Sequence, residues 1–285
     1  MDVSYPSQLS VIVTNRCNLR CKLCLQPQND LDIDPKLLDK MNHVFPQLEW
    51  FHPIGGEPML YDLHRLFNLP FGDHCKMKLI TNGTLLTDKN VNGIVKKVGR
   101  LMISVDGGTQ EAYRAMRGYD LTKILKGVQR VQASKAASGS LTPSLEFNFL
   151  LTKTTINSLP TLAEYAGAYG IDCINTFYPQ FIEPSLEKAE KINRDEALPY
   201  IEAAKKHISI IEPENRGGKI CRRPWNTCFV NLNGDVTLCC FGSPVVGNLN
   251  KKSFNDIWFG KAATQIRETV NTDKEIPACR NCTVK

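Results

Sequence analysis

The sequence predicts an α/β fold, a partial (β/α)6 barrel followed by a small cysteine-rich domain with a β-hairpin and a helix. Three observations predict it: short apolar segments alternate with helical ones six times up to about residue 212, a linker-like stretch covers 212–220, and six of the eleven cysteines lie beyond it. Six βα units in series imply parallel strands joined by right-handed crossovers. A doubly wound open sheet has the same order of elements, so both shapes stay open.

Each predicted strand is short, apolar and rich in β-branched or aromatic residues, as buried parallel strands are. The predicted strands are Leu9–Thr14, Leu48–Ile54, Met77–Thr81, Leu101–Val105, Leu145–Leu151 and Asp172–Tyr178. The intervening segments have helical spacing, with capping residues such as Asp34 before the first helix and Gly170 after a later one. The predicted helices are Pro35–Phe45, Tyr61–Leu69, Thr87–Val98, Thr109–Met116, Leu121–Ala137, Leu159–Tyr169 and Arg194–Ile211.

The C-terminal segment has a different pattern. Asn233-Gly234 separates two alternating runs, Phe229–Leu232 and Asp235–Leu238, which is typical of a tight hairpin. One helix is expected near Ser253–Glu268. We therefore divide the chain into a domain at 1–212 and a domain at 213–285.

Composition narrows the class of protein. The chain has 285 residues, of which 42% are hydrophobic and 22% charged, as in globular proteins. The net charge of +6 comes from scattered basic residues, so we expect neither nucleic acid nor a membrane surface as a partner. We find no signal peptide and no apolar run of about 20 residues, which predicts a cytoplasmic protein. Its thiols should then be reduced, and clustered thiols indicate metal binding.

Three cysteines follow the first predicted strand, with the spacing Cys17-x3-Cys21-x2-Cys24. Thiolates select zinc or an iron–sulfur cluster. A structural zinc site needs four ligands, and the next histidines, His43 and His52, are distant in sequence. Three thiolates suit a 4Fe–4S cluster that leaves one iron open to another ligand.

Further motifs follow the later strands. Gly55-Gly56-Glu57-Pro58 follows the second strand, Thr81-Asn82-Gly83 the third and Ser104-Val105-Asp106-Gly107 the fourth, and Met116-Arg117-Gly118 comes later. The cysteine loop has the pattern CX3CXφC, with Leu23 as the hydrophobic residue φ. Together these motifs resemble the radical S-adenosylmethionine (SAM) superfamily, over almost the whole chain. The fold that this implies is a partial (β/α)6 TIM-like barrel.

The resemblance implies how SAM is bound. The GGEP motif would bind the amino group of SAM. Residues at the ends of the third and fourth strands would bind its ribose, and Arg117 would bind its carboxylate. The cofactor-binding residues expected on this basis are Leu23, Gly55, Gly56, Glu57, Asn82, Ser104, Asp106 and Arg117. The open iron would chelate SAM, and one electron, from a reducing partner such as flavodoxin or ferredoxin, would cleave it. The resulting 5′-deoxyadenosyl radical would abstract a hydrogen atom from the substrate.

Alternation on the fifth predicted strand places Glu146 and Asn148 on one face and Leu145, Phe147 and Phe149 on the other. Polar residues that face into a barrel predict a cavity rather than a packed interior.

The C-terminal cysteines predict a second metal centre. By spacing alone, a hairpin that brings Cys221 and Cys239 together with the knuckle Cys279-x2-Cys282 resembles a zinc ribbon. The pattern also resembles the SPASM/twitch extension of radical SAM enzymes, which implies an auxiliary 4Fe–4S cluster on these four thiolates. The further cysteines of the full SPASM pattern do not follow, so we expect one auxiliary cluster, with Cys228 as the reserve ligand. We interpret Cys240 as a buried thiol or a hydrogen-atom donor.

The substrate is the least determined feature. Only about ten residues precede the first strand, so we expect no N-terminal peptide-recognition domain, and a sugar or cyclitol that is oxidised or epimerised is the main hypothesis. The cysteine pattern is similar to the 2-deoxy-scyllo-inosamine dehydrogenase family. The first alternative is an enzyme that epimerises or crosslinks a ribosomally made peptide. The second alternative is a non-catalytic module that binds an iron–sulfur cluster or zinc. Candidates for a general base, none assigned, are His52, Lys153, Tyr178 and Glu183.

Overall fold

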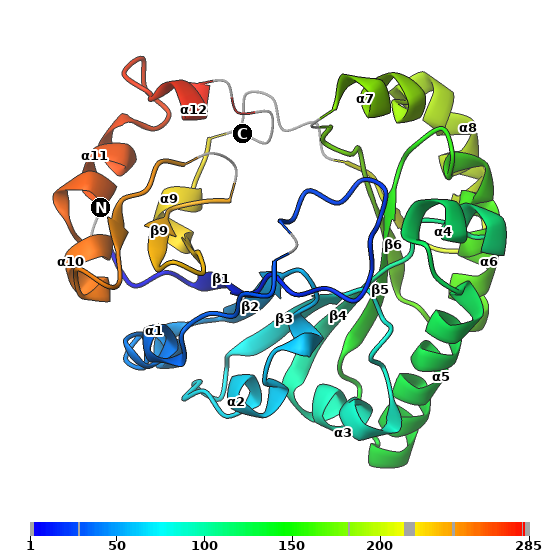
Figure 1. Cartoon of the computed structure of the whole chain (residues 1–285), viewed down its shortest axis with the longest axis horizontal. Coiled ribbons are helices and arrows are strands. Elements are labelled where there is room, and N and C mark those ends of the chain that lie inside the picture. Colours follow the sequence, from blue (N-terminus) through cyan, green and yellow to red (C-terminus); the bar gives the residue numbers. More distant parts are fainter. Residues whose placement is uncertain are drawn as a thin grey trace. The chain divides into compact units, whose positions relative to one another are not determined.

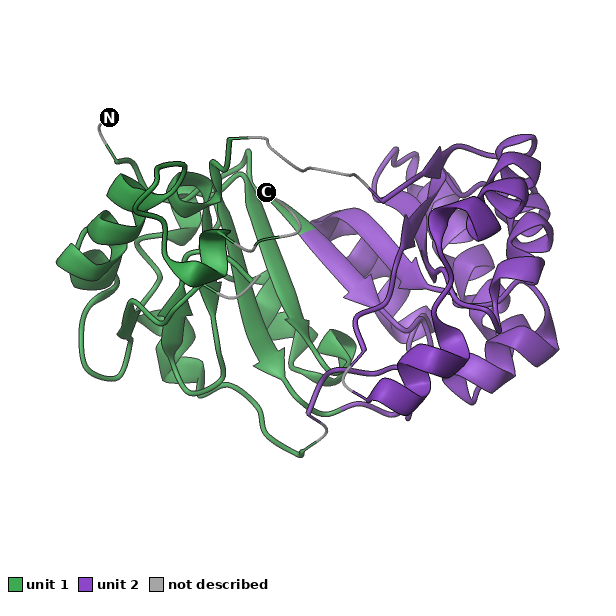
Figure 2. Ribbon diagram, turned by 90° about the horizontal axis from the view of Figure 1, so that it is seen from above, with its two compact units in different colours: residues 1–16, 28–77, 214–285 green, residues 17–27, 78–213 purple. Residues whose placement is uncertain are grey.

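A computed structural model describes residues 3–27, 29–181, 183–213, 220–240, 243–280 and 282. The chain forms two compact units (Figure 2). Unit 1 contains Met1–Arg16, Gln28–Met77 and Glu214–Lys285, and unit 2 contains Cys17–Pro27 and Lys78–Pro213. Most of the linker expected at 212–220 lies outside the described residues, and the division at residue 212 stays a prediction.

Unit 1 is built on a mixed sheet, of which β1, β2, β3 and β9 are labelled in Figure 1. Its strands are β1 (Gln8–Thr14), β2 (Trp50–Gly55), the first residues of β3 (Lys76–Thr81), β8 (Thr227–Val230), β9 (Asp235–Thr237) and β10 (Gly247–Asn248). They follow the order β10-β9-β8-β1-β2-β3. β1 is parallel to both β2 and β8, and β8 and β9 form the antiparallel hairpin predicted from Asn233-Gly234. The C-terminal segment thus extends the sheet that begins with β1.

The helices of unit 1 are short: α1 (Pro35–Asp39), η1 (Phe45–Gln47), η2 (Pro58–Leu60), α2 (Leu63–Phe67), α9 (Arg223–Asn226), α10 (Phe254–Trp258), α11 (Lys261–Thr269) and α12 (Pro277–Arg280). The helix expected over Pro35–Phe45 ends at Asp39 and continues as turns into η1. The single helix expected near Ser253–Glu268 is two helices. Gly260 separates them in an extended conformation, and a Cβ atom there would lie 2.1 Å from the Asp256 carbonyl oxygen.

Unit 2 holds the strands β4 (Val98–Ser104), β5 (Ser144–Leu150), β6 (Cys173–Phe177) and β7 (Ile210–Ile211), which are parallel and adjacent in that order. Its helices are α3 (Asp88–Lys97), α4 (Gln110–Arg117), α5 (Leu121–Ser138), η3 (Ile156–Ser158), α6 (Leu159–Ala168), α7 (Pro184–Glu190) and α8 (Arg194–Lys205). The helix expected to reach Ile211 ends at Lys205, because the β-branched pair Ile210 and Ile211 joins the sheet beside β6. α7 was not predicted.

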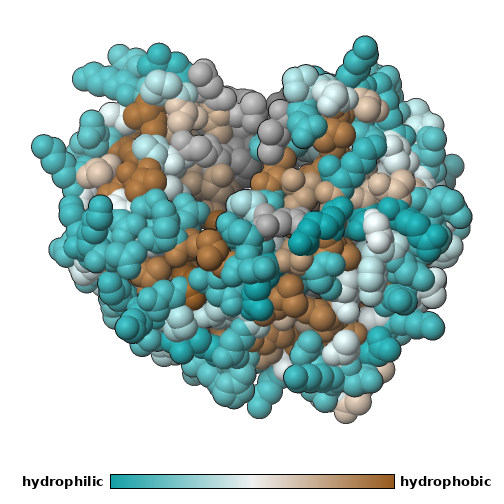
Figure 3. All heavy atoms as spheres, in the orientation of Figure 1, coloured by the Kyte–Doolittle hydropathy of each residue, from teal (hydrophilic) through white to brown (hydrophobic). Residues whose placement is uncertain are grey.

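Burial in unit 2 follows the alternation along the strands. Leu145, Phe147 and Phe149 of β5 have no exposed surface and form the apolar core with the covering helices. Within this layer α3 packs on α5, and α6 packs on α8. The opposite face of β5 carries the polar residues discussed below. Figure 3 shows that hydrophilic residues cover most of the face in view, with apolar side chains between them.

Among the described residues, we find no helix whose length and apolar character would let it cross a membrane.

Candidate functional site

The cysteine loop after β1 belongs to unit 2. Cys17 and Cys21 are half-buried and Cys24 is exposed. A turn joins the Cys24 amide to the Cys21 carbonyl at 3.2 Å, and the Lys22 amide donates to the Met116 carbonyl near the end of α4 at 2.9 Å. The three thiols are thus presented by a loop whose centre is fastened to α4.

Two of these thiols accept N–H groups from side chains of unit 2. Asn82 Nδ2 lies 3.8 Å from Cys17 Sγ, and Arg117 Nη1 lies 3.7 Å from Cys21 Sγ. Burial raises the pKa of the Cys21 thiol, and the positive charge of Arg117 opposes that rise. Donors and a positive charge beside sulfur stabilise the thiolate form that binds metal.

Arg117 and Asp106 form a buried ion pair. Arg117 ends α4, and Gly118 follows it in the left-handed conformation with φ of 68°. Arg117 Nε donates to Asp106 Oδ2 at 2.6 Å, and the Leu150 amide donates to Asp106 Oδ1 at 2.8 Å. Burial alone would lower the pKa of Arg117, but the Asp106 carboxylate, together with the Cys21 and Tyr113 side chains, outweighs burial and raises the pKa. The structure therefore joins two expected SAM-binding residues to each other and to the thiol of Cys21.

The other expected SAM-binding residues of unit 2 lie at strand ends. Asn82 follows β3, and its Oδ1 accepts from the Thr84 amide at 2.9 Å. Ser104 is the last residue of β4, is half-buried, and is in register with Asn148 of β5. Leu23 lies in the cysteine loop and is half-buried.

The GGEP motif belongs to unit 1, at the end of β2. The Gly56 amide donates to the Thr14 carbonyl at 2.9 Å, and the Glu57 amide donates to the Arg16 carbonyl at 2.8 Å. A Cβ atom on Gly56 would lie 2.3 Å from the Arg16 carbonyl oxygen, and one on Gly55, where φ is +139°, would lie 1.9 Å from that of Thr14. The glycines therefore allow two backbone segments to meet just before Cys17, a local reason for them that the sequence did not reveal.

Glu57 is fully buried, and its Oε1 caps the turn η2 by accepting from the Met59 amide at 3.1 Å.

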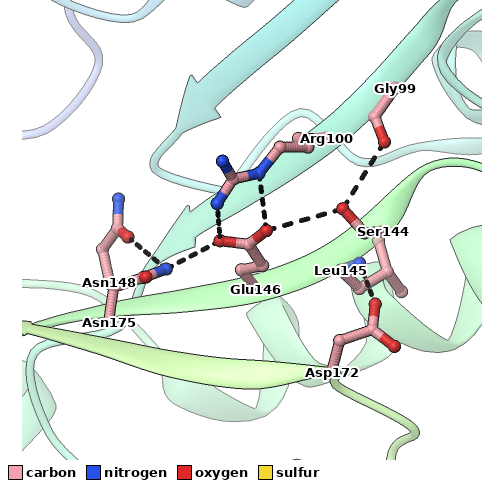
Figure 4. A network of polar contacts seen from close by, with 8 residues as sticks. All are labelled: Gly99, Arg100, Ser144, Leu145, Glu146, Asn148, Asp172 and Asn175. Atoms are coloured by element: carbon pink, nitrogen blue, oxygen red, sulfur yellow. Dashed lines mark hydrogen bonds and ion pairs between the residues drawn. The ribbon is translucent and has the colours of Figure 1, made fainter. Parts of the chain in front are cut away.

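A polar network lies on the face of β5 for which we predict a cavity (Figure 4). Glu146 accepts from Arg100 Nε at 2.7 Å and Nη2 at 2.6 Å, and from Asn175 Nδ2 at 2.8 Å. Burial raises the pKa of Glu146, but these hydrogen bonds, together with the charges of Arg100 and Lys78, outweigh burial and hold the pKa below its usual value. Glu146 is thus paired with residues of the neighbouring strands, which the pattern of one strand cannot show, and the cavity stays a prediction.

The four cysteines expected to hold the auxiliary cluster come together in unit 1. Cys221, Cys239, Cys279 and Cys282 line one cavity, and apolar side chains complete its wall, among them Pro224, Leu238, Ile266 and Val270. Burial raises the pKa of Cys279, and the nearby Cys239 and Cys221 raise it further. A thiol-lined cavity with apolar walls fits an iron–sulfur cluster.

In the part of the chain that the structure describes, no three Cys, His, Asp or Glu side chains are grouped so that they could hold one metal ion. Zinc draws thiolates to about 2.3 Å from one point. Thiolates of a cluster bind different irons, so they can lie farther apart. By residue type alone, the four thiols that line this cavity suit either a zinc ion or an iron–sulfur cluster.

Asn271 and Arg267 hold the backbone around Cys221, and neither residue was predicted from the sequence. Asn271 Oδ1 accepts from the Cys221 amide at 2.8 Å, and Asn271 Nδ2 donates to the Cys221 carbonyl at 3.0 Å. Arg267 is 5% exposed and donates to the carbonyls of Pro224 at 2.8 Å and Trp258 at 2.7 Å. Asn just after a predicted helix is a known C-terminal signal and could have indicated Asn271.

Two further cysteines of unit 1 differ in their surroundings. Cys228 lies in β8, is 1% exposed, and has a pKa raised to about 12, mainly by burial. Its surroundings are those of a core thiol rather than a ligand. Cys240 is exposed, so its interpretation as a buried thiol is wrong. β9 ends at Thr237, and the strand alternation used to bury Cys240 therefore does not reach it.

The candidates for a general base are spread over both units. His52 lies within β2, whereas Tyr178 directly follows β6 and is 38% exposed. Lys153 and Glu183 are exposed and lie near α7. The geometry assigns the role to none of them.

Comparisons with known proteins give the family. The family model of the radical SAM superfamily matches residues 11–142, and the SPASM model, an iron–sulfur cluster-binding domain, matches residues 221–283. The chain is similar to the tungsten-containing aldehyde ferredoxin oxidoreductase cofactor-modifying protein of Pyrococcus furiosus, with 24% identity over 318 residues, covering 96% of this chain and 86% of the relative. It is also similar to the PqqA peptide cyclase of Granulibacter bethesdensis, with 24% identity over 320 residues, covering 97% and 79%.

Among solved structures, SuiB of Streptococcus suis, bound to the precursor peptide SuiA, matches with a TM-score of 0.73 and 15% identity, covering 99% of this chain and 70% of that one. The structural match and the radical SAM model confirm the predicted fold class, a TIM-like α/β fold with a C-terminal SPASM domain.

The family models also confirm the predicted cofactors. A radical SAM domain implies SAM and a 4Fe–4S cluster, and a SPASM domain implies auxiliary iron–sulfur clusters. The cysteine loop lies within the first match, and the thiol-lined cavity is built from the second. The chain therefore belongs to the radical SAM superfamily, as an enzyme with a SPASM iron–sulfur cluster-binding domain.

Proposed function

We propose that the protein modifies a peptide by radical SAM chemistry. The observation that carries the proposal is the likeness, over almost the whole chain, to proteins with peptide substrates: a PqqA peptide cyclase and a SuiB enzyme bound to its precursor peptide. This replaces the sugar or cyclitol as the main hypothesis, which the comparisons do not support. That hypothesis depended on the short segment before β1, and the length of that segment does not determine what a barrel binds.

In this proposal the cysteine loop holds the SAM-binding cluster through Cys17, Cys21 and Cys24. The N–H donors Asn82 and Arg117 support it, since they lie against the sulfurs of Cys17 and Cys21. The bound cofactors supply a 5′-deoxyadenosyl radical that takes a hydrogen atom from the substrate. A small electron carrier such as flavodoxin or ferredoxin is the proposed reductant.

Arg117 and Asp106 are proposed to bind SAM as a pair, together with Leu23, Asn82 and Ser104. The buried Asp106 carboxylate holds the guanidinium in place beside the cysteine loop. A fixed guanidinium is suited to pair with a carboxylate such as that of the SAM methionine group. The roles expected for Gly55, Gly56 and Glu57 remain proposals of the same kind.

The auxiliary cluster is proposed to lie on Cys221, Cys239, Cys279 and Cys282. The cavity that these four residues line supports the assignment, as does the core position of Cys228. With four thiolates a 4Fe–4S cluster has no open iron, so the proposed role is electron transfer rather than binding of the peptide.

The exposed Cys240 favours epimerisation as the first modification to test. Epimerisation needs a hydrogen-atom donor after the first abstraction, and an exposed thiol can supply one. Crosslinking needs no donor, so the two outcomes separate at this residue.

The test uses anaerobically reconstituted protein with dithionite, SAM and synthetic peptides encoded by short reading frames beside its gene. A parallel set of polyols and aminocyclitols is the comparison. The proposal predicts that a peptide, and no small molecule, is converted with formation of 5′-deoxyadenosine. In deuterated water, epimerisation should add one deuterium per modified residue, and this incorporation should be lost in the Cys240→Ala variant. Crosslinking should instead lower the mass of the peptide by two hydrogens. Conversion of a polyol but of no peptide would contradict the proposal.

A further inference from the structure

Glu190, at the end of α7, is a buried carboxylate that the sequence did not single out. It is 1% exposed. Its Oε1 accepts from Lys22 Nζ at 2.5 Å and from Thr154 Oγ1 at 2.7 Å, and its Oε2 accepts from the Thr154 amide at 3.2 Å. A buried carboxylate persists only where such partners compensate for its lost hydration.

Its ionic partner, Lys22, lies inside the cysteine loop. Lys22 follows Cys21 directly, and its own amide donates to the Met116 carbonyl at 2.9 Å. Its side chain is 38% exposed, so the ion pair lies at the border between solvent and the buried carboxylate. The residue between two proposed cluster ligands is thus held at both ends, by α4 through the backbone and by α7 through the side chain.

The carboxylate also fastens α7 to the segment that follows β5. Besides the two bonds from Thr154, the Lys153 amide donates to the Glu190 carbonyl at 3.0 Å. α7 lies between β6 and α8 in sequence, and it lines an open cavity of about 480 Å³ with Lys153, Asn193 and Glu196. Glu190 is therefore the point where the cysteine loop, α7 and the loop after β5 meet within unit 2.

We propose that Lys22 and Glu190 form a positioning pair that holds the segment Cys21–Cys24 in the geometry in which the cluster binds SAM. The inference rests on the proposed function, because it takes the three cysteines as cluster ligands. In this proposal the role of the pair does not depend on contact with cofactor or substrate. It acts by restricting the loop, because a loop restricted before binding loses less conformational freedom when the ligand binds.

The test compares Lys22→Met, Glu190→Gln, the double variant and Lys22→Arg, all in the full chain with both clusters. The matched control is Glu187→Gln, which removes an ion pair with Lys191 at 2.7 Å from the same helix, where both side chains are exposed. SAM affinity is read from the change in the EPR spectrum of the reduced cluster during a SAM titration. The spectrum of the Cys17→Ala/Cys21→Ala/Cys24→Ala variant is subtracted to remove the auxiliary signal.

The proposal predicts that Lys22→Met and Glu190→Gln each weaken SAM binding roughly tenfold, the size expected for one charge-assisted hydrogen bond. The double variant should weaken SAM binding by the same factor, because either single change already removes the ion pair between Lys22 and Glu190. Lys22→Arg and Glu187→Gln should stay within about twofold of the unmodified chain.

SAM binding unchanged in Lys22→Met would overturn the proposal, and so would a double variant whose loss is the product of the two single losses. If Glu190→Gln does not fold, Lys22→Met still decides, since Thr154 continues to satisfy Glu190 there. The proposed function fails separately: in that case the unmodified chain itself shows no response to SAM or no peptide modification.

Discussion

Asn271 offers a test in which one position separates backbone strain from hydrogen bonding. It follows α11 with a φ of 67°, and its side-chain amide binds both backbone polar groups of Cys221. Asn271→Gly keeps the backbone conformation and loses both hydrogen bonds. Because both bonds are exposed to solvent, their loss should destabilise the segment around Cys221 by about 1.5 kcal/mol. Asn271→Ala loses the same bonds and adds roughly 1 kcal/mol for a left-handed residue with a Cβ atom. Asn271→Asp keeps the acceptor, so it should lose about half as much as Gly.

The assay is the rate at which an iron chelator removes the auxiliary cluster, in a Cys17→Ala/Cys21→Ala/Cys24→Ala background that lacks the other cluster. If opening at Cys221 limits release, each 1.4 kcal/mol corresponds to about tenfold in rate. Release should be fastest in Asn271→Ala, slower in Asn271→Gly, slower again in Asn271→Asp and slowest with Asn271 itself. Equal rates for all four would refute the reasoning, because Cys221 would then not depend on Asn271. Equal rates for Ala and Gly alone would refute the strain component.

Three further predictions concern buried groups of each unit. Glu146→Gln should lower the thermal midpoint at neutral pH, as measured by scanning fluorimetry, because it breaks charge-assisted hydrogen bonds from Arg100. The pKa of Glu146 is lower in the folded than in the unfolded chain. The difference in midpoint from the unmodified chain should therefore be present above the unfolded pKa and disappear as pH falls through the folded pKa. Arg267→Met should lower the free energy of unfolding in urea by about 2–3 kcal/mol. Two buried carbonyls lose their hydrogen-bond donor, and the guanidinium no longer stacks 4.3 Å from the centre of the Trp258 ring. A change below about 0.5 kcal/mol would contradict this prediction. Cys228→Ala should leave the iron content unchanged and cost about 1 kcal/mol of packing, whereas a loss of iron would make it a ligand.

Much of the fold follows from local sequence, and the exceptions have physical reasons. The predicted strands and the Asn233-Gly234 hairpin appear, with shifts of at most three residues at their ends. The C-terminal part of the helix expected to Ile211 is a strand instead, because pairing with β6 overrides a helical pattern. Gly260 breaks another predicted helix because of a close backbone approach, and such distances are not encoded in apolar spacing.

The candidate site was predictable where chemistry depends on spacing along the chain. The cysteines of the loop and of the thiol-lined cavity were found from their intervals and residue type. Residues that act through contacts across the fold were missed, since Glu190 lies 168 positions from Lys22. The packing of Gly56 against Arg16 and the exposure of Cys240 depend in the same way on where separate segments meet.

The central claim is that three cysteines hold a cluster with one iron left for SAM, and EPR of the oxygen-free, reduced protein tests it most directly. Adding SAM should change the g-values of the cluster signal that disappears in Cys17→Ala/Cys21→Ala/Cys24→Ala, and freeze-quench ENDOR with nitrogen-labelled SAM should detect coupling to its amino group. A cluster signal that SAM leaves unchanged, with no nitrogen coupling, would contradict the account.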